Sequence, residues 1–124
     1  MRSRVKPGTG RSAGLVLRIY LGFTLVRQPL GMTHFVYIMA SRPGGALFVG
    51  RTRDLRAHIE AHRSGLSRHT AKYKIRTLVW FEAHEAFDAA LLRERRIKGW
   101  KRPWKDALIT RVNPNWKDVT YSIP

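Results

Sequence analysis

One segment near residue 34 constrains the fold of this chain more than any other. Residues 34–40 read HFVYIMA and are apolar at both odd and even positions, with aromatic and β-branched side chains among them. Successive side chains of a strand point to opposite faces of a sheet. A strand with this pattern is therefore covered on both faces. We expect a sheet in which this strand is buried between other elements.

The residues that follow predict a hairpin and then helices packed on a sheet. The turn RPGG at 42–45 is expected to join the first strand to its partner. Further strands are expected at 46–50 and 76–81. Helices are expected at 53–64, 85–100 and 103–111, with a helical turn or loop at 67–74. The predicted fold class is α+β, a small three-stranded antiparallel sheet with flanking helices in the order β-β-α-α-β-α-α.

The 124 residues correspond to one domain with short additions at both ends. Residues 1–31 contain six Lys and Arg and no acid, and their apolar run at 13–26 is interrupted by Arg18. This run is shorter than the roughly 20 residues of a membrane span. We interpret residues 1–31 as a basic N-terminal extension. A start codon assigned upstream of Met32 is favoured over a disordered arm, and a targeting segment comes last. The domain is expected at 32–118, followed by a tail at 119–124.

The net charge of the chain indicates what kind of partner it binds. Lys and Arg number 24 against 8 Asp and Glu, a net charge of +16, and residues 32–124 alone carry 18 basic and 8 acidic residues. Such an excess attracts polyanions through Coulomb forces and counterion release. We therefore expect nucleic acid as the partner, ahead of a membrane or an acidic protein. The chain has no cysteine, which excludes disulfides and thiolate metal sites and suits a cytoplasmic protein.

One carboxylate falls on the apolar stripe of the helix predicted at 85–100. Phe87, Ala90, Leu91 and Ile97 recur at helical spacing, and Glu94 shares their face. Burying a carboxylate is costly unless a cation or metal compensates. Two interpretations remain: a metal ligand, or an ion pair with one of the basic residues at 93–98.

Two histidines share a face of the helix predicted at 53–64. His58 and His62 are four residues apart, so both imidazoles could reach one metal ion. The string HIEAH differs, however, from the His-Glu-x-x-His pattern of zinc proteases, and spacing assigns no third ligand. Packed or hydrogen-bonded histidines are the favoured interpretation, with a histidine-based metal protein as the alternative.

Basic residues surround the start of the first predicted helix and continue beyond it. They are interleaved with Tyr73 and Trp80, a pattern that favours a surface following phosphates over solvated charge. The residues expected to contact nucleic acid are Arg51, Arg53, Arg56, Arg68, Lys72, Lys74 and Lys98.

Taken together, several segments resemble the GIY-YIG nuclease superfamily. The resemblance is closest to its small stand-alone bacterial members, which are similar to the nuclease domain of the excision-repair endonuclease subunit. It covers about residues 33–118. The segments that carry it are VYI at 36–38, FVG at 48–50, DL at 54–55, RERRIK at 93–98, WKR at 100–102 and NPNWKD at 113–118.

This resemblance implies a one-metal phosphodiester hydrolase that acts on nucleic acid, DNA first. Glu94 takes the position of the family's metal ligand, for Mg²⁺ with Mn²⁺ as a substitute. Tyr37 and Phe48 take the positions of two tyrosines that activate water or hold the scissile phosphate. Arg51 directly follows the motif glycine, where the family often has a basic residue.

Two of the positions implied by the resemblance depart from the family pattern. Phe48 has no hydroxyl, so it cannot donate, accept or pass a proton. His58 stands where the family has an arginine, and it lacks the fixed charge and the bidentate fork of a guanidinium. His62 occupies a position where the family commonly has Tyr or His, and Arg51 or Arg56 could compensate for the missing charge. The expected function is a weak or compensated endonuclease; the alternative is a catalytically inactive DNA- or RNA-binding module.

Overall fold

The structure, a computed structural model, describes residues 33–124, so the predicted N-terminal extension lies outside the described residues. Three strands form one antiparallel sheet in the order β2-β1-β3. They are β1 (His34–Ala40), β2 (Leu47–Thr52) and β3 (Thr77–His84). The predicted α+β class and three-stranded antiparallel sheet are confirmed.

The helices follow the predicted order. Between β2 and β3 lie α1 (Leu55–Arg63) and α2 (Arg68–Lys72), so the expected helical turn is present. After β3 come α3 (Phe87–Gly99), α4 (Arg102–Val112) and a short 3-10 helix, η1 (Thr120–Ser122). None of the helices described has the length and apolarity needed to cross a bilayer.

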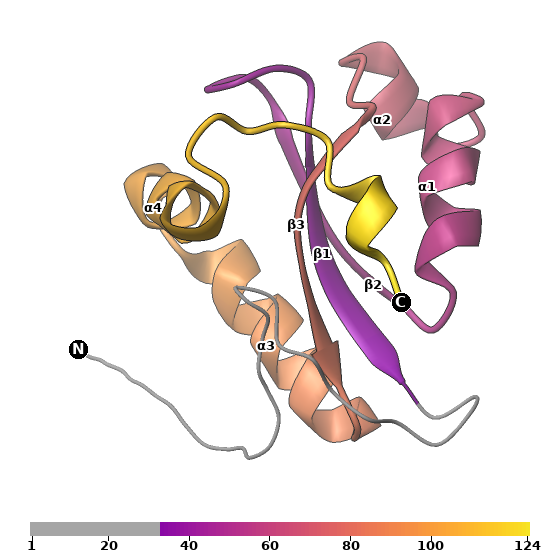
Figure 1. The fold of residues 1–124 in the computed structure, drawn as a ribbon, viewed down its shortest axis with the longest axis vertical. Helices are drawn as coiled ribbons and strands as arrows, with labels where there is room; N and C mark the ends of the chain where they lie inside the picture. Colours follow the sequence, from indigo (N-terminus) through magenta and orange to yellow (C-terminus); the bar gives the residue numbers. More distant parts are fainter. Residues whose placement is uncertain (1–32) are drawn as a thin grey trace.

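Both faces of the sheet are covered, as the pattern of β1 predicts. Figure 1 shows α3 and α4 on one side of the sheet and α1 and α2 on the other. On the first side, the core cluster contains Val36, Ile38 and Ala40 of β1 with Ala90, Ile97 and Ile109 of the helices. On the second side, it contains Phe35, Tyr37 and Met39 with Leu55 and Ile59 of α1. The alternation of β1 side chains thus divides the interior into two cores.

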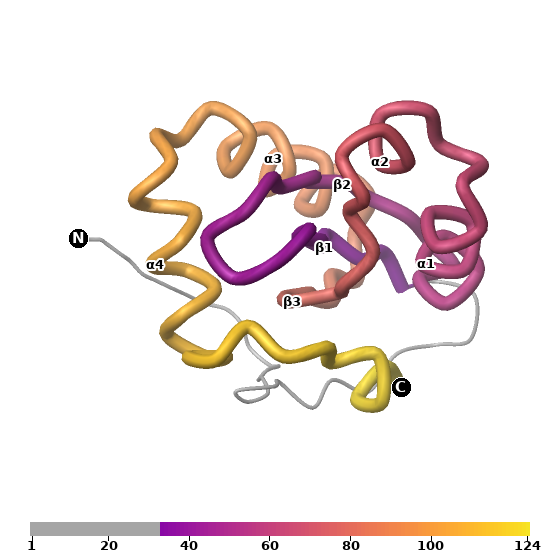
Figure 2. Tube along the Cα trace, turned by 90° about the horizontal axis from the view of Figure 1, so that it is seen from above, coloured from indigo at the N-terminus to yellow at the C-terminus, as the bar shows by residue number. Residues whose placement is uncertain are grey.

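The packed part of the chain extends beyond residue 118. Val119 and Ile123 are buried in the core on the α1 side, and the Val119 amide donates to the Leu78 carbonyl at 2.9 Å. Arg56 donates to the Ile123 carbonyl at 3.0 Å. Figure 2 shows this C-terminal segment running beside β3. The residues expected as a tail therefore cover part of the sheet, because two aliphatic side chains four positions apart are buried on either side of the 3-10 turn.

The junction between β2 and α1 sets the position of the candidate site. β2 continues to Thr52, two residues beyond its expected end at Gly50, because Thr52 still pairs with Phe35. Asp54 caps α1 by accepting from the Ala57 amide at 3.2 Å. Thr52, whose position suits a helix cap, instead accepts from the Asp54 amide at 3.0 Å. Arg51 therefore lies within the edge strand and has a fixed facing direction.

Candidate functional site

Gly50 makes room for the phenol of Tyr37. The two residues lie opposite each other in the β1–β2 pairing. A Cβ atom at Gly50 would lie 2.6 Å from the Tyr37 oxygen and 2.8 Å from the Phe48 ring. The Tyr37 ring therefore occupies the space that a side chain at Gly50 would need.

The Tyr37 hydroxyl is hydrogen-bonded to a histidine of α1. Tyr37 Oη lies 3.0 Å from His62 Nε2, and both side chains are buried. The other ring nitrogen of His62, Nδ1, lies 2.9 Å from Thr70 Oγ1 at α2. Burial, with a smaller effect of the His58 charge, lowers the pKa of His62, so its ring is neutral near pH 7.

Phe48 and His58 lie beside this pair. The Phe48 ring centroid is 4.8 Å from that of His62 and 6.0 Å from that of Tyr37. His58 is exposed, and its ring lies edge-on to Tyr37 at 6.4 Å. Four predicted site residues are thus gathered on the α1 side of the sheet.

The remaining two predicted residues, Arg51 and Glu94, lie on the other side of the sheet, where α3 packs. Arg51 pairs with Val36, whose side chain faces α3, and Arg51 Nε donates to Glu94 Oε1 at 3.0 Å. Lys98 Nζ lies 2.9 Å from Glu94 Oε2. The Glu94 side chain is only 12% exposed, so the stripe on α3 correctly predicts its inward position. Phe87 of the same stripe is instead half-exposed, and the Arg51 guanidinium covers its ring at 4.8 Å.

The negative charge of Glu94, on the α3 side of the sheet, affects the pKa of Tyr37 on the α1 side. Burial acts to raise the pKa of the Glu94 carboxyl, but hydrogen bonds and charges from Lys98 and Arg51 outweigh it and lower that pKa. Glu94 is therefore ionised at neutral pH. Burial raises the pKa of Tyr37, and the negative charge of Glu94 raises it further.

Glu94 is the carboxylate of this region that could hold a divalent metal ion. Within residues 33–124 no group of three or more His, Cys, Asp or Glu could enclose a metal. Mg²⁺ is commonly held by one or two carboxylates together with water and substrate phosphates, so Glu94 alone suffices for such a site. Arg51 and Lys98 already occupy its oxygens and would compete with the ion. His62 uses both ring nitrogens in hydrogen bonds, which argues against a zinc pair with His58.

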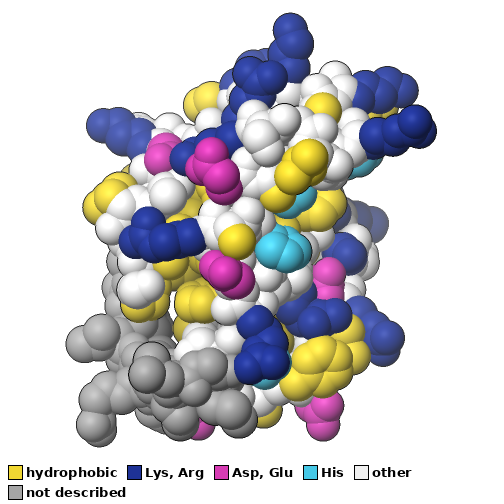
Figure 3. Space-filling view, turned by 90° about the vertical axis from the view of Figure 1, so that its right-hand side faces the viewer, with side chains coloured by type: hydrophobic (Ala, Val, Ile, Leu, Met, Phe, Trp, Pro, Cys, Tyr) yellow, Lys and Arg dark blue, Asp and Glu magenta, His cyan; other side chains and the backbone are white. Residues whose placement is uncertain are grey.

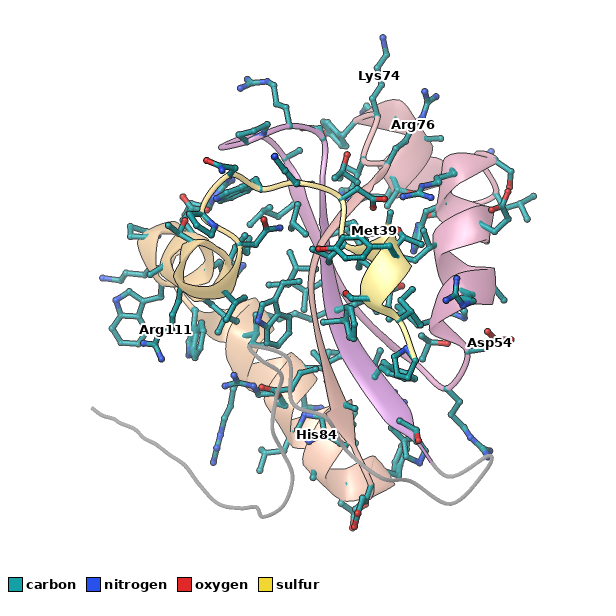
Figure 4. All side chains as sticks on the ribbon, in the orientation of Figure 1. Met39, Asp54, Lys74, Arg76, His84 and Arg111 are labelled. Atoms are coloured by element: carbon teal, nitrogen blue, oxygen red, sulfur yellow. The ribbon has the colours of Figure 1, made fainter. Side chains whose placement is uncertain are left out.

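Only part of the expected basic surface is available to a ligand. Arg68, Lys72 and Lys74 are exposed on and just after α2, and Figure 4 shows Lys74 extending away from the body of the protein. Figure 3, which views the side of α1 and α2, shows Lys and Arg side chains spread over that face with a histidine near its centre. Arg53 is exposed too, although it also interacts within the protein.

The other expected phosphate contacts are engaged within the protein. Arg51 and Lys98 bind Glu94, and Arg56 binds the C-terminal segment. Thr70 was missed in the sequence, because a lone threonine in a basic loop carries no signal of its burial against His62. The partner Arg51 for Glu94 was missed too, since the two residues are 43 positions apart and only the fold brings them together.

Several known proteins are similar to this chain. The family model described as GIY-YIG catalytic domain matches residues 33–107, more than half of the chain. UPF0213 proteins of Staphylococcus aureus strains Mu3 and Mu50 are each 40% identical over 81 residues, which cover 62% of this chain and 94% of each relative. The solution NMR structure of a UPF0213 protein from Bacillus halodurans is similar at 28% identity and a TM-score of 0.46, covering 73% of this chain and 97% of that one.

Proposed function

Because this chain belongs to the GIY-YIG catalytic domain family, as the sequence motifs predict, we propose that it is a weak, metal-dependent endonuclease that binds and cleaves DNA. The family is of the nuclease type, and it implies a nucleic acid substrate. The observation that carries the proposal is that Tyr37 lies against Gly50 of β2, while the next residue of that strand, Arg51, binds Glu94. A phenol can transfer a proton, a guanidinium can stabilise the charge that develops on the phosphate, and an ionised carboxylate can hold a metal ion.

Each of these residues has a role that its geometry supports. Glu94 would hold the divalent ion, Mg²⁺ or Mn²⁺, which when bound polarises the scissile phosphate. Arg51 and Lys98 flank Glu94 and supply positive charge where negative charge develops on the phosphate. The buried phenol oxygen of Tyr37 lies beside Gly50 of the edge strand β2. The exposed cations of α2 would hold the DNA backbone.

Three observations favour slow chemistry, and they also support the second candidate, a catalytically inactive nucleic-acid-binding module. Phe48 brings no hydroxyl to the cluster, and the exposed His58 provides no guanidinium. In addition, both oxygens of Glu94 are neutralised by side chains of the protein itself. A metal ion must compete with these two cations, which weakens its binding.

Cleavage assays with a binding arm separate the two candidates. Branched, flapped and supercoiled DNA would be incubated with the protein in Mg²⁺ or Mn²⁺, alongside Glu94→Ala and the control Glu85→Ala, which removes an exposed glutamate outside the site. Slow cleavage that Glu94→Ala abolishes and Glu85→Ala retains supports the endonuclease. Glu94→Ala should still bind DNA, because it frees Arg51 and Lys98. Binding without any cleavage by the wild type supports the inactive module, and cleavage that survives Glu94→Ala contradicts both.

A further inference from the structure

A chain of hydrogen bonds leads from Tyr37 into the protein interior. Tyr37 Oη contacts His62 Nε2 at 3.0 Å, His62 Nδ1 contacts Thr70 Oγ1 at 2.9 Å, and the Thr70 hydroxyl donates to the Ser67 carbonyl at 3.3 Å. Thr70 is completely buried. No water is needed to complete the chain, since each polar atom in it has a protein partner.

The heavy-atom distances fit either tautomer of His62, so the proton on Thr70 decides between them. A hydroxyl has a single proton, and if that of Thr70 goes to the Ser67 carbonyl, Thr70 Oγ1 accepts from His62 Nδ1. A neutral imidazole that donates from Nδ1 has its lone pair on Nε2. Tyr37 must then donate its proton to Nε2, because the two atoms cannot both be acceptors.

We propose that Thr70 is a positioning residue that holds His62 in the Nδ1–H tautomer, so that His62 Nε2 receives the Tyr37 proton during phosphodiester hydrolysis. This inference rests on the proposed endonuclease function and assigns the proton acceptor within the same site. Thr70 acts through His62 and does not touch the DNA.

The proton transfer balances without any added reagent. As a water molecule attacks phosphorus, one of its protons passes to the Tyr37 oxygen while the phenol proton passes to His62 Nε2. The bond between phosphorus and the attacking oxygen forms, the bond to the leaving oxygen breaks, and the leaving oxygen takes a proton from solvent. The resulting imidazolium keeps its Nδ1–H bond to Thr70 and later returns its extra proton to solvent.

The surroundings of Tyr37 and His62 favour a relay over a free phenolate. Burial, and then Glu94, raise the pKa of Tyr37, so a phenolate is unfavourable and its proton must leave only as another arrives. The lowered pKa of His62 keeps its ring neutral, so one ring nitrogen carries no proton and is able to accept. Phe48 packs against His62 and offers no hydroxyl that could compete for Nε2.

The tautomer can be observed directly by NMR of the full chain labelled with ¹⁵N-histidine near pH 7. The His62 signals would be assigned by their loss in His62→Gln. Wild type should show a proton on Nδ1 and an acceptor Nε2, and Tyr37→Phe should shift the Nε2 resonance. Thr70→Val should move the population towards Nε2–H, whereas Thr70→Ser should keep the wild-type pattern. Thr110→Val removes a threonine hydroxyl from α4, where it contacts Trp116, and should change nothing at His62.

Three outcomes overturn the proposal: wild-type His62 protonated on Nε2, wild-type His62 protonated on both nitrogens, or a tautomer unchanged in folded Thr70→Val. If Thr70→Val does not fold, the wild-type and Thr70→Ser spectra still decide. Where the wild type cleaves DNA, Thr70→Val should lower the rate constant by about 10-fold or more, with Thr70→Ser near wild type. Absence of cleavage counts against the proposed function alone, because the tautomer is read without turnover.

Discussion

Gly50 lies opposite Tyr37 in the sheet, and any side chain there would meet the phenol. The Cβ of an alanine would lie 2.6 Å from the Tyr37 oxygen and 2.7 Å from its Cζ. The ring cannot move freely, because it is buried and bonded to His62. We expect Gly50→Ala to lower the free energy of unfolding by about 1–3 kcal/mol, the usual cost of overpacking. Denaturant titration measures this directly.

Gly99→Ala is the matched control for that substitution. Gly99 is the last residue of α3, it is exposed, and a Cβ there would meet nothing within 4 Å. Alanine favours helix over glycine by about 0.5–1 kcal/mol, so this variant should be at least as stable as wild type. Equal stability of Gly50→Ala and Gly99→Ala would show that the Tyr37 ring adapts without cost.

Phe48 and His58 are the positions at which added groups should raise activity. Both rings lie about 6 Å from that of Tyr37, so a phenol at 48 and a guanidinium at 58 would enter the same cluster. We expect Phe48→Tyr with His58→Arg to raise the cleavage rate by up to about 10²-fold, since one transition-state donor is worth that much or more. Both single variants should be assayed on the same DNA substrates.

The gain should disappear when Glu94→Ala is added, because the carboxylate that would hold the metal is lost. A fast wild-type enzyme that depends on Glu94 and is unaffected by the double substitution would contradict this prediction. Phe48 and His58 would then belong to an efficient variant of the site.

Strands and helices can be predicted from the sequence, because the residues that form each of them are close together in the chain. The bounds of β1 match the apolar run at 34–40, and Glu94 lies inward because helical spacing dictates it. Contacts between elements that are far apart in the chain cannot be predicted in this way. The pairing that extends β2 to Thr52, the Arg51–Glu94 ion pair and the burial of Thr70 against His62 all depend on how strands and helices are placed in three dimensions.

The packing of α3 on β3 includes an ion pair that should make stability depend on acid. Arg93 donates to both oxygens of Glu82, at 2.9 and 3.2 Å, and His84 lies 2.8 Å from one of them. Burial acts to raise the pKa of Glu82, but Arg93 and His84 outweigh it and lower the pKa from 4.5 to about 2. The folded protein therefore binds this proton less readily than the unfolded chain.

The sign of the effect follows from that difference. The contribution of Glu82 to stability is fully present above about pH 4.5 and is lost as pH falls towards about 2. Glu82→Gln should lower the free energy of unfolding by about 1–2 kcal/mol at neutral pH, a value reduced for solvent screening. The difference in stability from wild type should shrink as pH falls from about 4.5 to about 2. Unfolding titrations at several pH values test this, with Glu85→Gln expected to have a smaller effect. A difference that is constant from pH 7 to 2 would contradict the prediction.

The net charge of the whole molecule predicts the kind of partner but not the place where it binds. The fold engages Arg51, Lys98 and Arg56 internally. The expected phosphate contacts on and just after α2, which are Arg68, Lys72 and Lys74, are exposed. If these contact phosphates, each should release condensed counterions when DNA binds.

DNA affinity should therefore fall steeply with salt, and a protein that starts at Met32 should still bind, since residues 32–124 keep an excess of ten positive charges. The triple change Arg68→Ala, Lys72→Ala, Lys74→Ala should weaken binding and reduce the slope of log K against log salt by about 2–3, close to one unit for each lost contact. The matched control removes three other exposed cations, at Lys101, Arg111 and Lys117. Fluorescence anisotropy at several salt concentrations measures both slopes. If the control reduces the slope as much as the α2 triple, then net charge alone governs binding and α2 is not the contact surface.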